Sequence, residues 1–79
     1  MKQFHIMLGS VSDVQDFVRS ASMRQFNVEA ILDTERVDAK SIMGLFTLDL
    51  RKPLLIEVDG GDEQVDDFMK EIGNVVLAS

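Results

Sequence analysis

The stretch that decides the fold is residues 36–50, which read RVDAKSIMGLFTLDL. Its first four residues, Arg36 to Ala39, predict a short strand that a polar turn connects to the preceding segment. After Ser41 the apolar residues are spaced as in a helix rather than a strand, although Gly44 interrupts the run. We therefore expect a short helix that carries more apolar side chains than it can bury: Ile42, Met43, Leu45, Phe46, Leu48 and Leu50.

The N-terminal segment predicts a strand followed by a helix. Residues 2–8 alternate between apolar and polar, which is the period of a half-buried strand and points His5 outward. Apolar residues then recur at helical spacing over residues 13–25. Ser12, followed three residues later by a glutamine, forms a capping-box pattern and is the predicted N-cap, with Ser10 as the rival cap.

The remaining segments complete a mixed fold. Residues 27–32 alternate and predict a strand that forms a hairpin with residues 36–39, and residues 54–58 form a compact apolar strand after Pro53. Asp62 is the predicted cap of a last amphipathic helix of about fourteen residues. This order predicts the α+β class, with helices on one face of a four-stranded sheet and water on the other. We expect a single domain over residues 1–79, because so short a chain cannot build two cores.

Composition and charge exclude several classes of function. The chain has no cysteine, which excludes disulfides and thiolate metal sites, and its one histidine cannot build a zinc site. Its net charge of −6 disfavours nucleic acids and anionic membranes as partners, because both bind basic surfaces. No apolar run has the length of a membrane span and no leader pattern is present, so we expect a cytoplasmic protein. The acids of residues 62–71 form an interaction surface or, more simply, the solvated face of the last helix.

Residues 37–44, which read VDAKSIMG, closely resemble the regulatory-serine motif of the HPr family. These proteins are the small phosphocarriers of the bacterial phosphoenolpyruvate-dependent sugar phosphotransferase system. The resemblance extends without gaps to Phe17-Val18, Ala21-Ser22 and Val28, which match the first helix and second strand of the family. It implies an open-faced β-sandwich of order β-α-β-β-α-β-α, with three helices on one side of an antiparallel four-stranded sheet.

The phosphoacceptor signature of the family is missing. HPr proteins carry the phosphoryl group on a histidine within Gly-(Leu/Ile)-His-Ala-Arg-Pro, and the position of that histidine, 31 residues before Ser41, is occupied here by Ser10. Ser12 stands at the position of the arginine, which would steady the phosphoryl group. A serine phosphate ester is too stable to pass its phosphoryl group on as a histidine phosphoramidate does. The resemblance therefore implies a divergent HPr-like protein that is not a competent carrier and not an enzyme.

Ser41 is the candidate regulatory site. The resemblance implies that an HPr-kinase-like enzyme phosphorylates it with ATP and that a transcriptional regulator, or another phosphotransferase-system protein, binds the product. The simpler alternative is that Ser41 is only a helix N-cap, and the two roles are compatible. The residues that resemble the docking patch of the family are Ile42, Met43 and Phe46, whereas Leu45, Leu48 and Leu50 are expected in the core.

Two other functions remain open from the sequence. A working phosphocarrier in sugar uptake would need an atypical acceptor, either His5 or Ser10. A subunit of an oligomer would use the exposed apolar patch for self-association. The sequence contains no motif that requires a cofactor or a metal ion.

Overall fold

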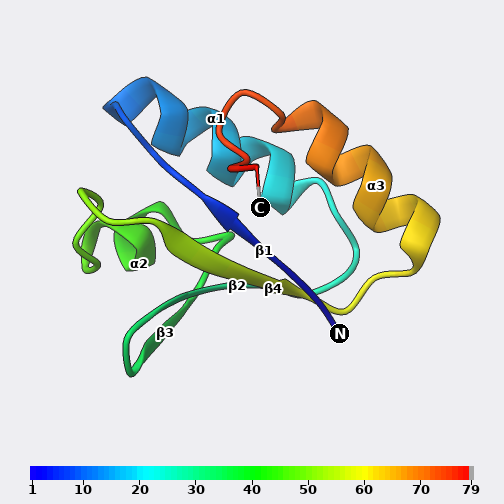
Figure 1. Ribbon diagram of the computed structural model, residues 1–79, viewed down its shortest axis with the longest axis horizontal. Coiled ribbons are helices and arrows are strands. Elements are labelled where there is room, and N and C mark those ends of the chain that lie inside the picture. Colours follow the sequence, from blue (N-terminus) through cyan, green and yellow to red (C-terminus); the bar gives the residue numbers. More distant parts are fainter. Residues whose placement is uncertain (79) are drawn as a thin grey trace.

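The computed structural model describes residues 1–78 as an α+β protein with seven elements (Figure 1). Their order is the one expected from the sequence. In chain order they are β1 (Lys2–Ile6), α1 (Val11–Ser22), β2 (Val28–Leu32), β3 (Glu35–Asp38), α2 (Ile42–Phe46), β4 (Leu54–Val58) and α3 (Asp62–Glu71).

The four strands form one antiparallel sheet in the order β1-β4-β2-β3. Ile56 of β4 lies opposite Phe4 on one side and Ala30 on the other, so one row of side chains faces the helices. Figure 1 shows α1 and α3 next to each other on that side of the sheet, and α2 lies between α1 and the β2–β3 hairpin. The expected sheet with three helices on one face is confirmed.

The core is the layer between this sheet face and the helices. Phe68 of α3 is fully buried there, and its ring centroid lies 5.9–6.3 Å from those of Phe4, Phe17 and Phe26. A Cβ atom on Gly60 would lie 2.6 Å from Cδ2 of Phe26, so this close approach requires a glycine. Aromatic packing thus fixes how the chain enters α3.

The two-residue turn between β2 and β3 depends on Asp33, which has a φ of 54°. Two-residue hairpins need a positive φ, and Asp adopts this region more readily than most non-glycine residues because its short polar side chain bonds locally. The next residue of the turn is Thr34. The turn therefore forms without a glycine.

The C-terminal segment differs from the prediction. Gly61, not Asp62, is the N-cap of α3, and its N–H donates to Oε1 of Gln64 at 3.2 Å. The helix ends at Glu71 and is shorter than expected, because residues 75–77 pair with β1. The amide of Met7 donates to the Val75 carbonyl, and that of Leu77 donates to the His5 carbonyl, both at 2.9 Å. This pairing occupies part of the outer edge of β1.

A polar contact joins α1 to α3. Ser20 Oγ donates to Glu71 Oε1, and Nη2 of Arg24 lies 3.2 Å from Glu71 Oε2. The Arg24 guanidinium also lies 5.4 Å from the centre of the Phe68 ring, where a cation is attracted to the ring face. These contacts fix the C-terminal half of α1 on α3.

Candidate functional site

The N-terminus of α1 is closed by its own side chains. Ser10 is the N-cap, with Oγ accepting from the amide of Asp13 at 3.1 Å. In return, Oδ2 of Asp13 accepts from the amide of Gly9 at 3.0 Å. The predicted cap at Ser12 is therefore wrong, and the helix begins at Val11. The reason is that Ser10 and Asp13 together satisfy two backbone donors, and the Asp13 carboxylate is favoured in the first turn by the helix dipole.

This closure changes what the helix terminus can bind. A helix N-terminus attracts a phosphate when its N–H groups are free and no anion is already present. Here the Ser10 hydroxyl takes one amide, and a carboxylate lies in the first turn of the helix. Such a terminus is a poor receptor for a phosphoryl group.

A hollow of about 420 Å³ connects the start of α1 to the end of α2. Ser10 and Val11 line it from α1, and Phe46 lines it from α2. Arg51, from the loop before β4, contributes its only basic group. Sequence reasoning missed Arg51 and Val11 as parts of this site, because no periodicity places a loop residue next to a helix terminus. We call this feature the α1–α2 hollow.

Arg51 is held by a carboxylate of its own loop. Its Nε and Nη2 donate to Asp49 Oδ1 and Oδ2 at 2.9 and 3.1 Å. These hydrogen bonds from Arg51 lower the pKa of Asp49 to about 2. The positive charge in the α1–α2 hollow is therefore already paired within the loop.

Ser41 is the N-cap of α2 and is half-buried. Its Oγ accepts from the amide of Gly44 at 3.1 Å. The neighbouring charges have other partners: Lys40 Nζ donates to the Arg24 carbonyl at 2.8 Å, and Asp38 Oδ1 accepts from the Lys40 amide at 2.9 Å. The capping role expected for Ser41 is thus present in the structure.

The three predicted docking residues differ in exposure. Met43 is 78% exposed and Phe46 is 50% exposed, whereas Ile42 is half-buried and packs against the core. Val11 of α1, 59% exposed, adds to the exposed apolar set. Of the leucines expected in the core, Leu45 and Leu48 are buried and Leu50 is half-buried.

His5 does not belong to the α1–α2 hollow. It lies in the middle of β1, exposed and opposite Leu55 of β4, and it does not line the space beside Ser10. The outward position expected from the alternation of β1 is confirmed. The structure therefore does not bring the single imidazole to the helix terminus.

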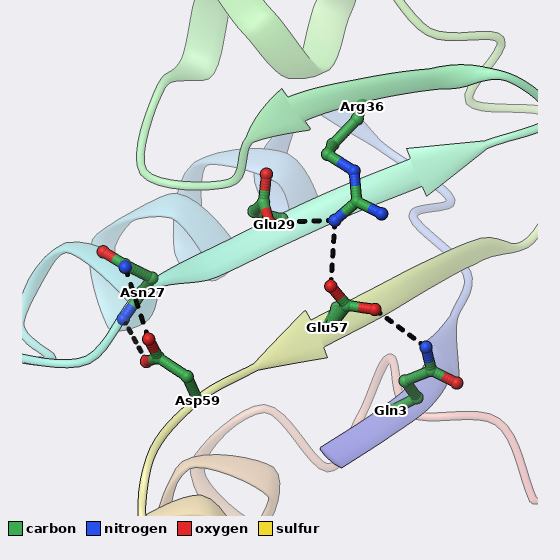
Figure 2. A network of polar contacts seen from close by, with 6 residues as sticks. All are labelled: Gln3, Asn27, Glu29, Arg36, Glu57 and Asp59. Atoms are coloured by element: carbon green, nitrogen blue, oxygen red, sulfur yellow. Dashed lines mark hydrogen bonds and ion pairs between the residues drawn. The ribbon is translucent and has the colours of Figure 1, made fainter. Parts of the chain in front are cut away.

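The face of the sheet opposite the helices carries a charged network (Figure 2). Nη1 of Arg36 lies 2.9 Å from Oε1 of both Glu29 and Glu57, and Gln3 Nε2 donates to Glu57 Oε2 at 2.8 Å. The hydrogen bonds from Arg36 and then Gln3 lower the pKa of Glu57. The network links β1, β4, β2 and β3, so it stabilises the sheet register without forming an acid–base pair.

Two further findings concern residues 1–78. Nowhere in this range do three or more His, Asp or Glu side chains gather closely enough to hold a metal ion. None of the helices in the described part of the chain has the length and apolar character needed to cross a bilayer.

Solved structures with the same architecture are phosphocarrier proteins. The histidine-containing phosphocarrier protein of Mycoplasma is 19% identical, with a TM-score of 0.71 over 92% of this chain and 89% of that one. HPr-C-His from Thermoanaerobacter tengcongensis is 25% identical, with a TM-score of 0.75 over 94% and 89%. HPr from Bacillus anthracis is 20% identical, with a TM-score of 0.67 over 89% and 94%.

These likenesses establish the HPr-like fold. No protein-family model matches the chain, and no curated protein matches it significantly. The part of the sequence resemblance that concerns architecture is therefore confirmed. The roles of Ser10, Ser12 and Ser41 stay predictions.

The cap assignment can be tested by removing each hydroxyl. We expect Ser10→Ala to lower the free energy of unfolding by about 1 kcal/mol, since the Asp13 amide loses its acceptor. Ser12→Ala is the matched control and should change it by less than about 0.5 kcal/mol, because Ser12 lies exposed in the first turn. Urea denaturation of both variants makes the measurement. Equal losses would contradict the assignment of Ser10 as the cap.

The sheet network predicts a pKa change at Glu57. Arg36→Gln should raise the Glu57 pKa toward its ordinary value of 4.5, since Arg36 is the largest cause of the lowering. A lowered carboxyl pKa stabilises the fold above the ordinary pKa, and this contribution is lost as the pH falls through the folded value. The variant should therefore lose less stability on acidification. A carboxyl NMR titration of the parent protein and of the variant measures the pKa of Glu57 in each. The pKa of Asp49 is the control, and it should be the same in both proteins.

Proposed function

We propose, from the HPr-like fold, that this chain is a regulatory protein-binding module related to the sugar phosphotransferase system and not a phosphocarrier. Ser41 is its site of regulatory phosphorylation, and its working place is the cytoplasm. The observation that carries the proposal is the reciprocal closure of the α1 N-terminus by Ser10 and Asp13.

The chemistry of this terminus argues against phosphoryl transfer. A carrier needs a nucleophile that forms a labile phosphoryl bond near neutral pH, which imidazole does and a serine hydroxyl does not. The Ser10 hydroxyl is occupied as a cap, and the Asp13 carboxylate would repel an incoming phosphoryl group. His5, the only imidazole, lies on β1 away from this terminus.

The exposed apolar side chains of α1 and α2 support a docking role. Phe46 lines the α1–α2 hollow from α2, Val11 lines it from α1, and Met43 is exposed on the same short helix as Phe46. Exposed apolar side chains next to a hollow mark a surface for protein partners, and methionine adapts to several of them. The partners we propose are an HPr-kinase-like enzyme, a transcriptional regulator or other phosphotransferase-system proteins.

Phosphorylation of Ser41 is compatible with its capping role. A phosphoester would add about −1.5 to −2 charge and three acceptor oxygens beside the Gly44 amide that Ser41 already binds. Lys40 and Asp38 have other partners, so the new charge would face solvent next to Met43. Modification would then change the docking surface without refolding the domain.

The carrier activity is tested with phosphoenolpyruvate and Enzyme I. We expect no phosphoryl label on the chain, because neither Ser10 nor His5 combines nucleophilicity with a receptive helix terminus. An HPr that carries the histidine is the positive control in the same assay, read by intact mass spectrometry. Label that disappears in His5→Ala or Ser10→Ala would replace this proposal with an atypical carrier.

The regulatory site is tested with ATP and an HPr kinase. We expect one added phosphate, located on Ser41 by fragmentation mass spectrometry and absent from Ser41→Ala. A phosphate elsewhere, or none, would leave Ser41 as a helix cap only.

Docking of the kinase on the exposed apolar side chains Val11, Met43 and Phe46 has a matched control in the same assay. Met43→Asp should slow phosphorylation, because it places a charge in the docking surface. Met23→Asp alters a methionine of similar exposure, 73% against 78%, that caps the C-terminal end of α1 and is not part of α2, and it should leave the rate unchanged. Equal slowing in both variants would contradict docking through this surface.

A further inference from the structure

A second hollow in the described part of the chain lies away from the proposed docking surface. It has a volume of about 750 Å³ and extends from β1 to the segment before β4 and to the C-terminal residues that pair with β1. Binding sites for small molecules have volumes of about 300–1,000 Å³. We call this feature the β1 hollow, and it shares no residue with the α1–α2 hollow.

The walls of the β1 hollow are mainly apolar. Leu32 comes from the end of β2, Pro53 precedes β4, and Leu77 belongs to the C-terminal segment. Leu77 is 39% exposed, and its amide donates to the His5 carbonyl. The pairing of the C-terminal residues with β1 therefore builds one wall of the hollow.

The polar groups of the β1 hollow are basic or neutral. Gln3, His5 and Lys52 line it, and no acidic side chain does. This is unusual in a chain with 14 acidic residues and a net charge of −6. One N–H of Gln3 is already bound to Glu57, whereas the His5 ring and the Lys52 ammonium have no side-chain partner within residues 1–78.

Lys52 is one of two lysine or arginine side chains that have no hydrogen-bond or ion-pair partner in the part of the chain that the structure describes. Most other basic side chains are ion-paired, and Lys40 donates to a backbone carbonyl. Only Lys52 and Lys70 have no side-chain partner within residues 1–78. Lys52 also lines a neighbouring hollow with Asp33, Glu35 and Asp49, but none of these carboxylates forms an ion pair with it. It is the smallest of the causes that lower the pKa of Asp49, which binds Arg51.

We propose that the β1 hollow binds a small carboxylate with an apolar tail. The anionic head is recognised by the Lys52 ammonium and by a ring N–H of His5, which supply the donors that a carboxylate accepts from. The tail lies against the apolar walls, where it removes exposed hydrophobic surface from water. A cationic or purely polar ligand has no matching group in the hollow.

NMR titration with octanoate tests the proposal. We expect saturable shifts of the His5 imidazole signals, which are unambiguous because the chain has one histidine, and of the Leu77 and Ala78 amides. Octylamine has the same tail with the opposite charge, and acetate has the head without the tail. Neither should give saturable shifts. Equal responses to octanoate and octylamine, or octanoate shifts centred on Phe46, would overturn the proposal.

Three variants distinguish the contacts made by the carboxylate head of octanoate from those made by its alkyl tail. Lys52→Gln should weaken octanoate binding about two- to fivefold, the range for an exposed ion pair. Lys70→Gln removes the same charge outside the hollow and should leave the affinity unchanged. Leu77→Ser should weaken octanoate binding, while its backbone bond to His5 is retained. Unchanged binding in both Lys52→Gln and Leu77→Ser, or equal weakening in both lysine variants, would contradict the site.

Discussion

The contact on which the rest of the structure depends is the packing of Phe68, which belongs to α3, against α1 and the sheet. Its ring meets Phe4 of β1, Phe17 of α1 and Phe26 of the loop that leads to β2. A buried aromatic side chain of this kind contributes several kcal/mol, about 3–5 when replaced by alanine. In a chain of 79 residues without a disulfide, this is a large part of the net stability. The positions of both helices on the sheet follow from it.

The position of α1 in turn determines what its N-terminus can do. Phe17 of α1 is buried in the core, and the start of the helix lines the α1–α2 hollow together with Phe46 and Arg51. A few side chains then determine what the α1 N-terminus and the surface of α2 can bind. Ser10 and Asp13 turn the terminus into a closed cap, whereas Met43 and Phe46 keep an apolar surface in contact with water. The proposed function rests on this combination of a closed helix terminus and an exposed apolar surface.

The two hollows have different chemistry because they are built by different contacts. The α1–α2 hollow lies between helix termini, and its cation is already bound to Asp49. The β1 hollow exists because residues 75–77 pair with the outer edge of β1, and it is lined by the free cation Lys52 and the only imidazole. We propose a partner protein for the first and a small amphiphilic anion for the second.

The sequence by itself determined the type and order of the elements and which strand residues face the helices, because these follow from periodicity along the chain. The resemblance of residues 37–44 to one family also predicted the architecture. Only the tertiary structure decided that Ser10 rather than Ser12 is the cap, that the last helix stops at Glu71, and that Arg51 lies beside Ser10. The physical reason is that each of these depends on a partner that periodicity does not specify: the Asp13 carboxylate, the open edge of β1 and the packing of α1 against the loop before β4.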